Sequence, residues 1–122
     1  VTALRELRIL QMCSHPNIVR LKRVVTGRKP HSIFLVFEYC EHDLGRLMDN
    51  MRAPFTEPQL KCLMLQLLEA VHFLHTHWIV HRDLKLSNLL FTNKGQLKLC
   101  DFGLARFFKP PTEEGSYTPR VV

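Results

Sequence analysis

The sequence predicts an α+β fold, and three patterns carry that prediction. Apolar residues recur at helical spacing over residues 56–77, which indicates a long amphipathic helix. Two β-rich runs at 18–26 and 32–39 are separated by turn-prone residues, and two shorter runs follow at 89–92 and 96–100. The composition, 46% hydrophobic and 23% charged, is that of an ordinary globular domain.

The first third of the chain should contain one helix and one pair of strands. A helix is expected over residues 1–13, and it should end near residues 14–16, where a proline disfavours its continuation. The strands 18–26 and 32–39 are expected to pair antiparallel across a turn at 27–30. The apolar stripe of the helix consists of Leu4, Leu7, Ile9, Leu10 and Cys13.

Two helices are expected in the middle of the chain. Asp43 is suited to cap a short helix over residues 44–51. Thr56 and Gln59 have the spacing of a capping box at the start of the helix over 56–77. The apolar stripe of this helix, which we expect in the core, consists of Leu60, Leu63, Met64, Leu67, Leu68, Val71 and Leu74.

Two polar motifs flank the last predicted hairpin. His-Arg-Asp-Leu-Lys-Leu-Ser-Asn occupies positions 81–88, and Asp-Phe-Gly occupies 101–103. The hairpin strands 89–92 and 96–100 lie between the motifs and are joined by the turn Asn-Lys-Gly at 93–95. Phosphoryl transfer requires a proton acceptor near the attacking hydroxyl, a cation near the γ-phosphate and oxygen ligands for magnesium. Asp83 is suited to be the proton acceptor and Lys85 the cation. Asn88 and Asp101 have the side-chain oxygens that magnesium requires.

With these motifs the chain resembles the eukaryotic protein kinase family and, within it, the cyclin-dependent kinases. The resemblance extends over essentially the whole chain. It also rests on Ala-Leu-Arg-Glu at 3–6, His-Pro-Asn-Ile-Val at 15–19, Phe-Leu-Val-Phe-Glu-Tyr-Cys at 34–40, Asp-Phe-Gly-Leu-Ala-Arg at 101–106 and Tyr-Thr-Pro at 117–119.

The resemblance implies the central fragment of the bilobal kinase fold, from the end of the regulatory helix to the activation segment. Residues 1–39 would be the remnant of the N-lobe, 40–43 the hinge, and 44–122 the start of the C-lobe through the activation segment. The five glycines are scattered, so no Gly-x-Gly-x-x-Gly loop covers phosphates, and the ATP-binding strand lysine and the lower C-lobe are also missing. We therefore expect the isolated chain to be inactive.

The resemblance also assigns catalytic roles. Asp83 would orient the substrate hydroxyl and accept its proton, and Lys85 would support the γ-phosphate of ATP. Asn88 and Asp101 would bind Mg²⁺. Glu6 would pair with the missing strand lysine, and the alternative for Glu6 is an ordinary solvated glutamate.

A nucleotide pocket is implied beside the hinge. Phe37 would close the back of the pocket, and Asp43 would reach the ribose; the alternatives are a plain core residue and a helix cap. Cys100 would line the pocket, either open to an electrophile or as a buried, inert thiol. The complete predicted set is Phe37, Glu38, Tyr39, Cys40, Asp43, Leu90, Cys100 and Asp101.

A regulatory constellation is implied as well. In cyclin-dependent kinases a phosphorylated threonine bridges three arginines, and the counterparts here are Thr118, Arg5, Arg82 and Arg106. A phosphate with about −1.5 to −2 charges accepts several charge-assisted hydrogen bonds and would order the segment. The alternative is three separate, solvated arginines.

Charge and cysteine usage narrow the expected partners and location. The net charge of +6 is spread along the chain, so we expect no nucleic acid partner. No apolar run reaches membrane-spanning length, and we expect no membrane association. The four cysteines show no paired spacing, which favours a reducing compartment, here the nucleus and cytoplasm. The histidines 72, 75, 77 and 81 lack converging ligands for a metal.

The implied function is a serine/threonine protein kinase of cyclin-dependent type that uses ATP and Mg²⁺. A cyclin-type regulatory subunit and protein substrates, phosphorylated before proline, are the partners that the family implies. A second hypothesis stays open: a catalytically inactive kinase fragment or interaction module, which would leave part of the stripe at residues 60–74 exposed.

Overall fold

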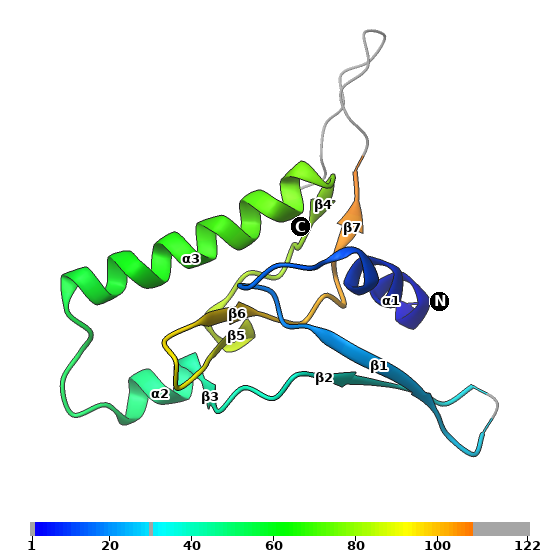
Figure 1. Ribbon diagram of the computed structural model, residues 1–122, viewed down its shortest axis with the longest axis horizontal. Helices are drawn as coiled ribbons and strands as arrows, with labels where there is room; N and C mark the ends of the chain where they lie inside the picture. Colours follow the sequence, from blue (N-terminus) through cyan, green and yellow to red (C-terminus); the bar gives the residue numbers. More distant parts are fainter. Residues whose placement is uncertain (1, 30, 109–122) are drawn as a thin grey trace, which may run out of the picture.

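The computed structural model describes residues 2–29 and 31–108 and confirms the α+β fold (Figure 1). The described residues form three small antiparallel sheets. Strand β1 (Leu21–Thr26) pairs with β2 (Ile33–Phe37), β5 (Leu89–Phe91) lies between β3 (His42–Asp43) and β6 (Leu97–Leu99), and β4 (Ile79–Val80) pairs with β7 (Arg106–Phe107). Helix α3 (Glu57–Thr76) extends along one side of the molecule, and α1 (Thr2–Met12) lies beside β7 at the other end (Figure 1). The division into N-lobe remnant, hinge and C-lobe at residues 39 and 43 stays a prediction.

The first helix and strand pair form as predicted. Helix α1 spans Thr2–Met12, and β1 (Leu21–Thr26) pairs antiparallel with β2 (Ile33–Phe37). Strand β1 begins later than residue 18, because Ile18 instead forms a parallel bridge to Leu99. Residues 17–19 are therefore paired with the second half of the chain.

A three-stranded sheet lies at the centre of the fold. Strand β5 (Leu89–Phe91) pairs with β3 (His42–Asp43) on one side and with β6 (Leu97–Leu99) on the other. The hairpin between β5 and β6 turns at Gly95, whose φ of 82° is easily reached by glycine. Strand β3 was not predicted, since its two residues gain order only from their distant partner β5.

Asp43 caps the helix that follows β3, as predicted. Its Oδ1 accepts a hydrogen bond from the Arg46 backbone N–H at 3.1 Å, which satisfies a donor in the first turn of α2 (Leu44–Asn50). Asp43 therefore joins the central sheet to the helix.

Helix α3 (Glu57–Thr76) begins at the predicted capping box. Gln59 N–H donates to Thr56 Oγ1 at 3.4 Å, and Thr56 N–H donates to Gln59 Oε1 at 2.9 Å. The prediction that the whole apolar stripe lies in the core is wrong. Leu74 is buried, whereas Leu60, Met64 and Leu68 are about half exposed, at 47%, 55% and 57%. Leu63 and Leu67 are partly buried against the core, so it is only part of the stripe that lies open.

The chain leaves α3 through a strained residue. Trp78 has a φ of 58°, a left-handed conformation that is unfavourable for a large side chain. Beyond it, β4 (Ile79–Val80) pairs antiparallel with β7 (Arg106–Phe107). The Trp78 ring packs edge-on against Phe108 at 5.0 Å between centroids, and Phe108 N–H donates to Trp78 O. These contacts close the loop that contains both polar motifs.

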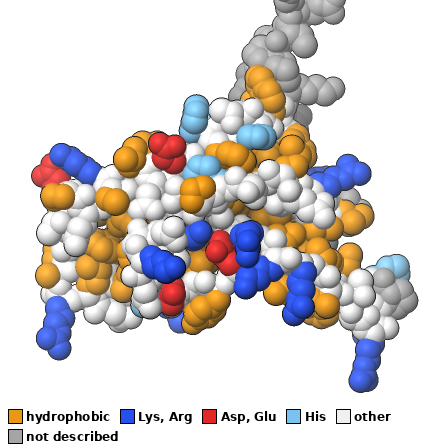
Figure 2. All heavy atoms as spheres, viewed as in Figure 1, with side chains coloured by type: hydrophobic (Ala, Val, Ile, Leu, Met, Phe, Trp, Pro, Cys, Tyr) orange, Lys and Arg blue, Asp and Glu red, His pale blue; other side chains and the backbone are white. Residues whose placement is uncertain are grey.

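The core lies where α1, α3 and β6 meet. Its largest fully buried side chains are Ile9, Ile18, Leu74, Ile79, Leu97, Leu99 and Phe102. Other apolar side chains lie open among charged ones on the face seen in Figure 2. Within the described part of the chain, none of the helices has the length and apolar character needed to cross a membrane.

The capping box at the start of α3 can be tested by substitution. Thr56→Ala removes the side-chain acceptor of the Gln59 N–H, and we expect the free energy of unfolding to fall by about 1 kcal/mol. Thr56→Ser keeps a hydroxyl and should stay close to wild type. Urea denaturation followed by circular dichroism measures both. An alanine variant as stable as the serine variant would contradict the role of the cap.

Candidate functional site

His81 ties the two polar motifs together. Its side chain is only 3% exposed, its Nδ1 accepts a hydrogen bond from the Asp83 N–H at 3.1 Å, and its Nε2 donates to the Cys100 carbonyl at 2.9 Å. The ring also packs edge-on against Phe102 at 4.9 Å. One buried imidazole thus fixes the loop of Asp83 relative to the strand end that precedes Asp101.

Asp83, Lys85 and Asn88 converge as the sequence predicted. Asn88 is buried, and its Nδ2 donates to the Asp83 carbonyl at 2.9 Å and to Asp83 Oδ2 at 3.1 Å. Lys85 Nζ lies 3.7 Å from Asp83 Oδ1. The 3₁₀ turn η1 (Leu86–Asn88) brings Asn88 back toward Asp83. One short loop therefore presents a carboxylate, an ammonium group and an amide side by side.

Asp101 lies next to this loop in a constrained backbone. Cys100 N–H donates to the Asn88 carbonyl at 3.0 Å, so Asp101 follows directly after a residue bonded to the loop of Asp83. The φ of Asp101 is 59°, and its Oδ1 accepts from the Gly103 N–H at 3.2 Å. The side chain of Asp101 is exposed. An exposed carboxylate in a fixed turn is available to a ligand.

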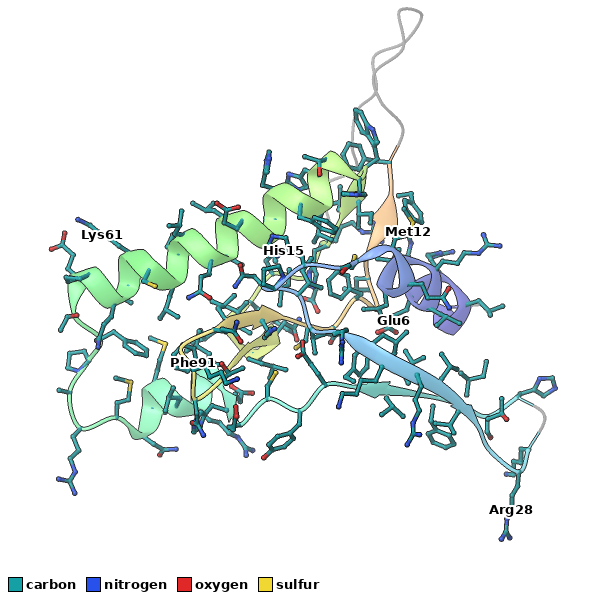
Figure 3. The ribbon with its side chains drawn as sticks, in the orientation of Figure 1. Glu6, Met12, His15, Arg28, Lys61 and Phe91 are labelled. Atoms are coloured by element: carbon teal, nitrogen blue, oxygen red, sulfur yellow. The ribbon has the colours of Figure 1, made fainter. Side chains whose placement is uncertain are left out.

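Glu6 reaches the Asp-Phe-Gly segment from α1. It projects toward the segment that joins β6 and β7 (Figure 3), where the Phe102 backbone N–H donates a hydrogen bond to it. Partial burial raises the pKa of Glu6, and the nearby negative charge of Asp101 raises it further. Glu6 therefore contacts the Asp-Phe-Gly segment and is not freely solvated.

The predicted nucleotide residues mostly gather around Cys100. The Cys100 thiol lies close enough to Cys40, Asp43 and Asp101 to be affected by their charges. Leu90 pairs with Asp43 across the β3–β5 ladder. Residues of the predicted hinge and of the Asp-Phe-Gly motif thus lie close to Cys100.

Three of the predicted nucleotide residues differ in their surroundings. Phe37 is partly buried and packs against the core cluster, so it is at least a core residue. Tyr39 is 82% exposed, so only its backbone is suited to a pocket. Glu38 forms an ion pair with Lys98, which sequence reasoning did not single out. The available signal was a lysine between two leucines in an apolar strand.

A second network that the sequence did not reveal supports β6 from the other side. Gln66 Oε1, on α3, accepts from Asn17 Nδ2 and from the Leu97 N–H, each at 2.9 Å. Gln66 Nε2 donates to the Gly95 carbonyl at 3.1 Å. This glutamine joins α3, the residue 17 loop and the β5–β6 hairpin.

The side chains at the site fit ATP and Mg²⁺ by their chemistry. Magnesium prefers oxygen ligands and commonly takes only one or two from the protein, with phosphates supplying others. The amide of Asn88 and the exposed carboxylate of Asp101 are such ligands, held by adjacent loops. Among the described residues, no three His, Cys, Asp or Glu side chains gather into a separate metal cluster.

The three predicted regulatory arginines are close together. Desolvation, and then the positive charges of Arg5 and Arg82, lower the pKa of Arg106. Arg82 Nε donates to the Leu104 carbonyl at 2.8 Å, and Arg106 Nη1 donates to the Ala105 carbonyl at 2.7 Å. Arg5 and Arg106 also line a groove of about 750 Å³ between α1 and β7. Thr118 lies outside the described residues.

Comparison with known proteins identifies relatives over the full length of the chain. The family model for the protein kinase domain matches residues 1–122. The probable cyclin-dependent kinase 10 of Dictyostelium discoideum is 57% identical over 122 residues, which is 100% of this chain and 33% of that protein. Cyclin-dependent kinase 10 of Homo sapiens is 52% identical with the same coverage. The chain thus spans about a third of these relatives.

One further relative and one solved structure also match this chain. Cyclin-dependent kinase G-1 of Oryza sativa subsp. indica is 52% identical over all of this chain and 17% of its own length. Among solved structures, the yeast RNA Pol II CTD kinase CTDK-1 complex matches with a TM-score of 0.81 and 39% identity. This match covers 88% of this chain and 35% of that one.

The environment of Cys100 predicts an unreactive thiol. Burial, followed by the charges of Asp101 and Asp43, raises the pKa of Cys100 from 9.0 to about 11. Because the thiolate is the nucleophile, and only about one such thiol in a thousand is ionised at pH 8, iodoacetamide should modify exposed Cys62 well before Cys100. Mass spectrometry after timed alkylation measures both sites.

The pH dependence of Cys100 alkylation gives an independent check on the environment of this thiol. The alkylation rate of Cys100 should keep rising with pH through about 10, since a raised pKa delays ionisation. Levelling of that rate near pH 9, or modification of Cys100 as fast as Cys62 at pH 8, would show that the thiol is not suppressed.

Proposed function

Because the chain belongs to the protein kinase family and its relatives are cyclin-dependent kinases, we propose that the protein is a serine/threonine kinase of cyclin-dependent type. It would transfer the γ-phosphoryl group of ATP to serine and threonine hydroxyls of protein substrates, before proline. The observation that carries the proposal is the joined pair Asp83 and Asn88, with Lys85 beside them and Asp101 on the adjacent loop.

The residues that would hold the nucleotide and metal come from both motifs. Asn88 and Asp101 would ligate Mg²⁺, and the backbone of residues 38–40 would hold the adenine above Leu90. When bound, Mg-ATP supplies the transferable phosphoryl group and neutralises charge on its oxygens. Glu6, which accepts a hydrogen bond from the Phe102 N–H, would pair with the strand lysine that the family resemblance implies.

Asp83 is the proposed proton acceptor. Its Oδ2 is bound by Asn88 Nδ2 and its Oδ1 faces Lys85, so the carboxylate is held in one orientation. The oxygen of a substrate hydroxyl forms the new bond to the γ-phosphorus, the bond to the β–γ bridging oxygen breaks, and the hydroxyl proton passes to Asp83. Lys85 would offset the negative charge of the γ-phosphoryl oxygens.

A cyclin-type subunit is the proposed regulatory partner. The relatives are named cyclin-dependent kinases, and the groove between α1 and β7 offers a surface suited to a protein. It is lined by apolar Leu4, Leu7 and Phe107 and by the arginines 5, 8 and 106. A nuclear and cytoplasmic location is proposed on the unpaired spacing of the cysteines and the family resemblance, and immunofluorescence of the tagged protein that shows only other compartments would contradict it.

The two carboxylates provide the main test of this function. In the chain extended to the length of its relatives and bound to a cyclin-type subunit, Asp83→Asn and Asp101→Asn should each lower kcat by about 10²- to 10⁴-fold. Asp49→Asn, at an exposed position of α2, is the matched control and should retain activity. Transfer of ³²P from ATP to a Ser-Pro peptide measures the rate.

Two outcomes would decide against the proposal. If the extended wild-type complex transfers no phosphate, the interaction-module hypothesis gains support. If both Asp83→Asn and Asp101→Asn match Asp49→Asn in kcat, the assignment of these residues is wrong even where transfer occurs.

The arginine cluster predicts activation by phosphorylation of Thr118. Because Arg5 and Arg82 act electrostatically on Arg106, an added phosphate would relieve their mutual repulsion and join α1 to the catalytic loop. Thr118→Ala should lower the activity of the phosphorylated complex roughly 5- to 150-fold, the usual span of such coupling. Thr112→Ala, in the same segment, is the control, and phosphopeptide mapping with kinase assays measures both. Equal activity of the two variants would remove this role.

A further inference from the structure

Lys98 is a buried cation in the middle of an otherwise apolar strand. The residue is 8% exposed, and its neighbours on β6, Leu97 and Leu99, are at most 1% exposed. Lys98 Nζ lies 3.4 Å from Glu38 Oε1. A lysine is seldom buried in this way unless it is paired, because removing an ammonium group from water is costly.

The partner of Lys98 belongs to the segment that follows β2. Glu38 N–H donates to the Arg20 carbonyl at 2.9 Å, and Glu38 Oε1 accepts from the Arg20 N–H at 2.9 Å. The carboxylate oxygen that meets Lys98 is therefore also bound to the backbone before β1. Lys98 thus contacts the first residue of the predicted adenine-binding backbone, and that residue is itself fixed on two sides.

The sheet places Lys98 in line with predicted nucleotide residues. Asp43 pairs with Leu90, and Leu90 pairs with Lys98, so the three form one row across β3, β5 and β6. Residues directly opposite each other in an antiparallel ladder have side chains on the same face. Lys98 therefore shares the face of the sheet that is proposed to lie below the nucleotide.

A cavity of about 290 Å³ borders the pair, with Glu38 and Lys98 in its wall together with Arg20 and His15. Loss of either charge would leave the other one partly buried without its partner, and the nearby cavity gives the Glu38 side chain room to turn toward water.

We propose that Lys98 is a positioning residue that holds residues 38–40 at a fixed height above the central sheet and so sets the affinity for the adenine moiety. In this proposal Lys98 acts through Glu38, with which it is paired, and not by direct contact with the nucleotide. The inference rests on the proposed kinase function. It adds a determinant of nucleotide affinity that lies outside the catalytic loop and the Asp-Phe-Gly motif.

Adenosine is the probe that isolates this effect, because it lacks phosphates and needs no metal. In the extended, cyclin-bound chain, Lys98→Met should raise the Kd for adenosine about tenfold, within the roughly 2- to 30-fold range that positioning residues produce. Lys94→Met is the matched control: Lys94 is exposed in the turn of the same hairpin and should leave the Kd unchanged. Isothermal titration calorimetry measures both constants.

Three further variants separate positioning from general stability. Glu38→Gln should raise the Kd by a similar factor, and the double variant should bind no more weakly than the worse single variant. Lys98→Arg keeps the charge and should restore most of the affinity. In kinase assays Lys98→Met should raise the KM for ATP more than it lowers kcat, whereas partial unfolding would lower kcat through the active fraction.

The outcomes that would overturn the inference are specific. If Lys98→Met folds and binds adenosine as tightly as Lys94→Met, the inference is wrong. If Lys98→Met does not fold, an unchanged adenosine affinity in Glu38→Gln overturns the inference instead. Failure of the proposed function looks different, since the extended wild-type complex would then neither bind adenosine nor transfer phosphate.

Discussion

The backbone pairing between residues 17–19 and β6 is the constraint on which the rest of the molecule depends. Val19 N–H donates to the Leu99 carbonyl at 3.0 Å, and Leu99 N–H donates to the Asn17 carbonyl at 2.8 Å. Ile18 and Leu99 are buried at this junction. Because these residues are about eighty positions apart, the pairing fixes the end of α1 and the β1–β2 pair against the strand that leads to Asp101.

A short series of hydrogen bonds connects this junction to the candidate site. Leu99 is followed by Cys100, whose N–H binds the Asn88 carbonyl and whose carbonyl binds His81. His81 in turn receives the Asp83 N–H. The polar groups of the proposed site are thus held next to a buried strand: Asn88 binds Asp83 through its side chain, and Asp101 follows directly after Cys100. For the proposed reaction, such preorganisation is the form in which a protein scaffold contributes most.

The parts that the sequence predicted are those with local signals. Thr56 and Gln59, Asp43, and the glycine of the 93–95 turn act within a few residues, so their pattern is sufficient to place helix starts and a hairpin. The two-residue strands β3, β4 and β7 have no such signal, because each is ordered only by a distant partner.

Lys98 was missed for the same reason: a lysine in a strand has the same sequence appearance whether or not Glu38 lies beside it. Exposure of Leu68 also depends on what packs against α3, which helical periodicity alone does not specify.

The left-handed backbone at Arg82 and Asp101, with φ values of 69° and 59°, has an evolutionary consequence. Residues in this region cost on the order of 1–3 kcal/mol unless they are glycine, and side chains branched at Cβ are the least tolerated. Isoleucine, valine and threonine are therefore excluded from both positions by backbone shape, before any requirement of charge is considered. The accessible routes of sequence drift through these two positions are therefore narrow, whatever the protein does.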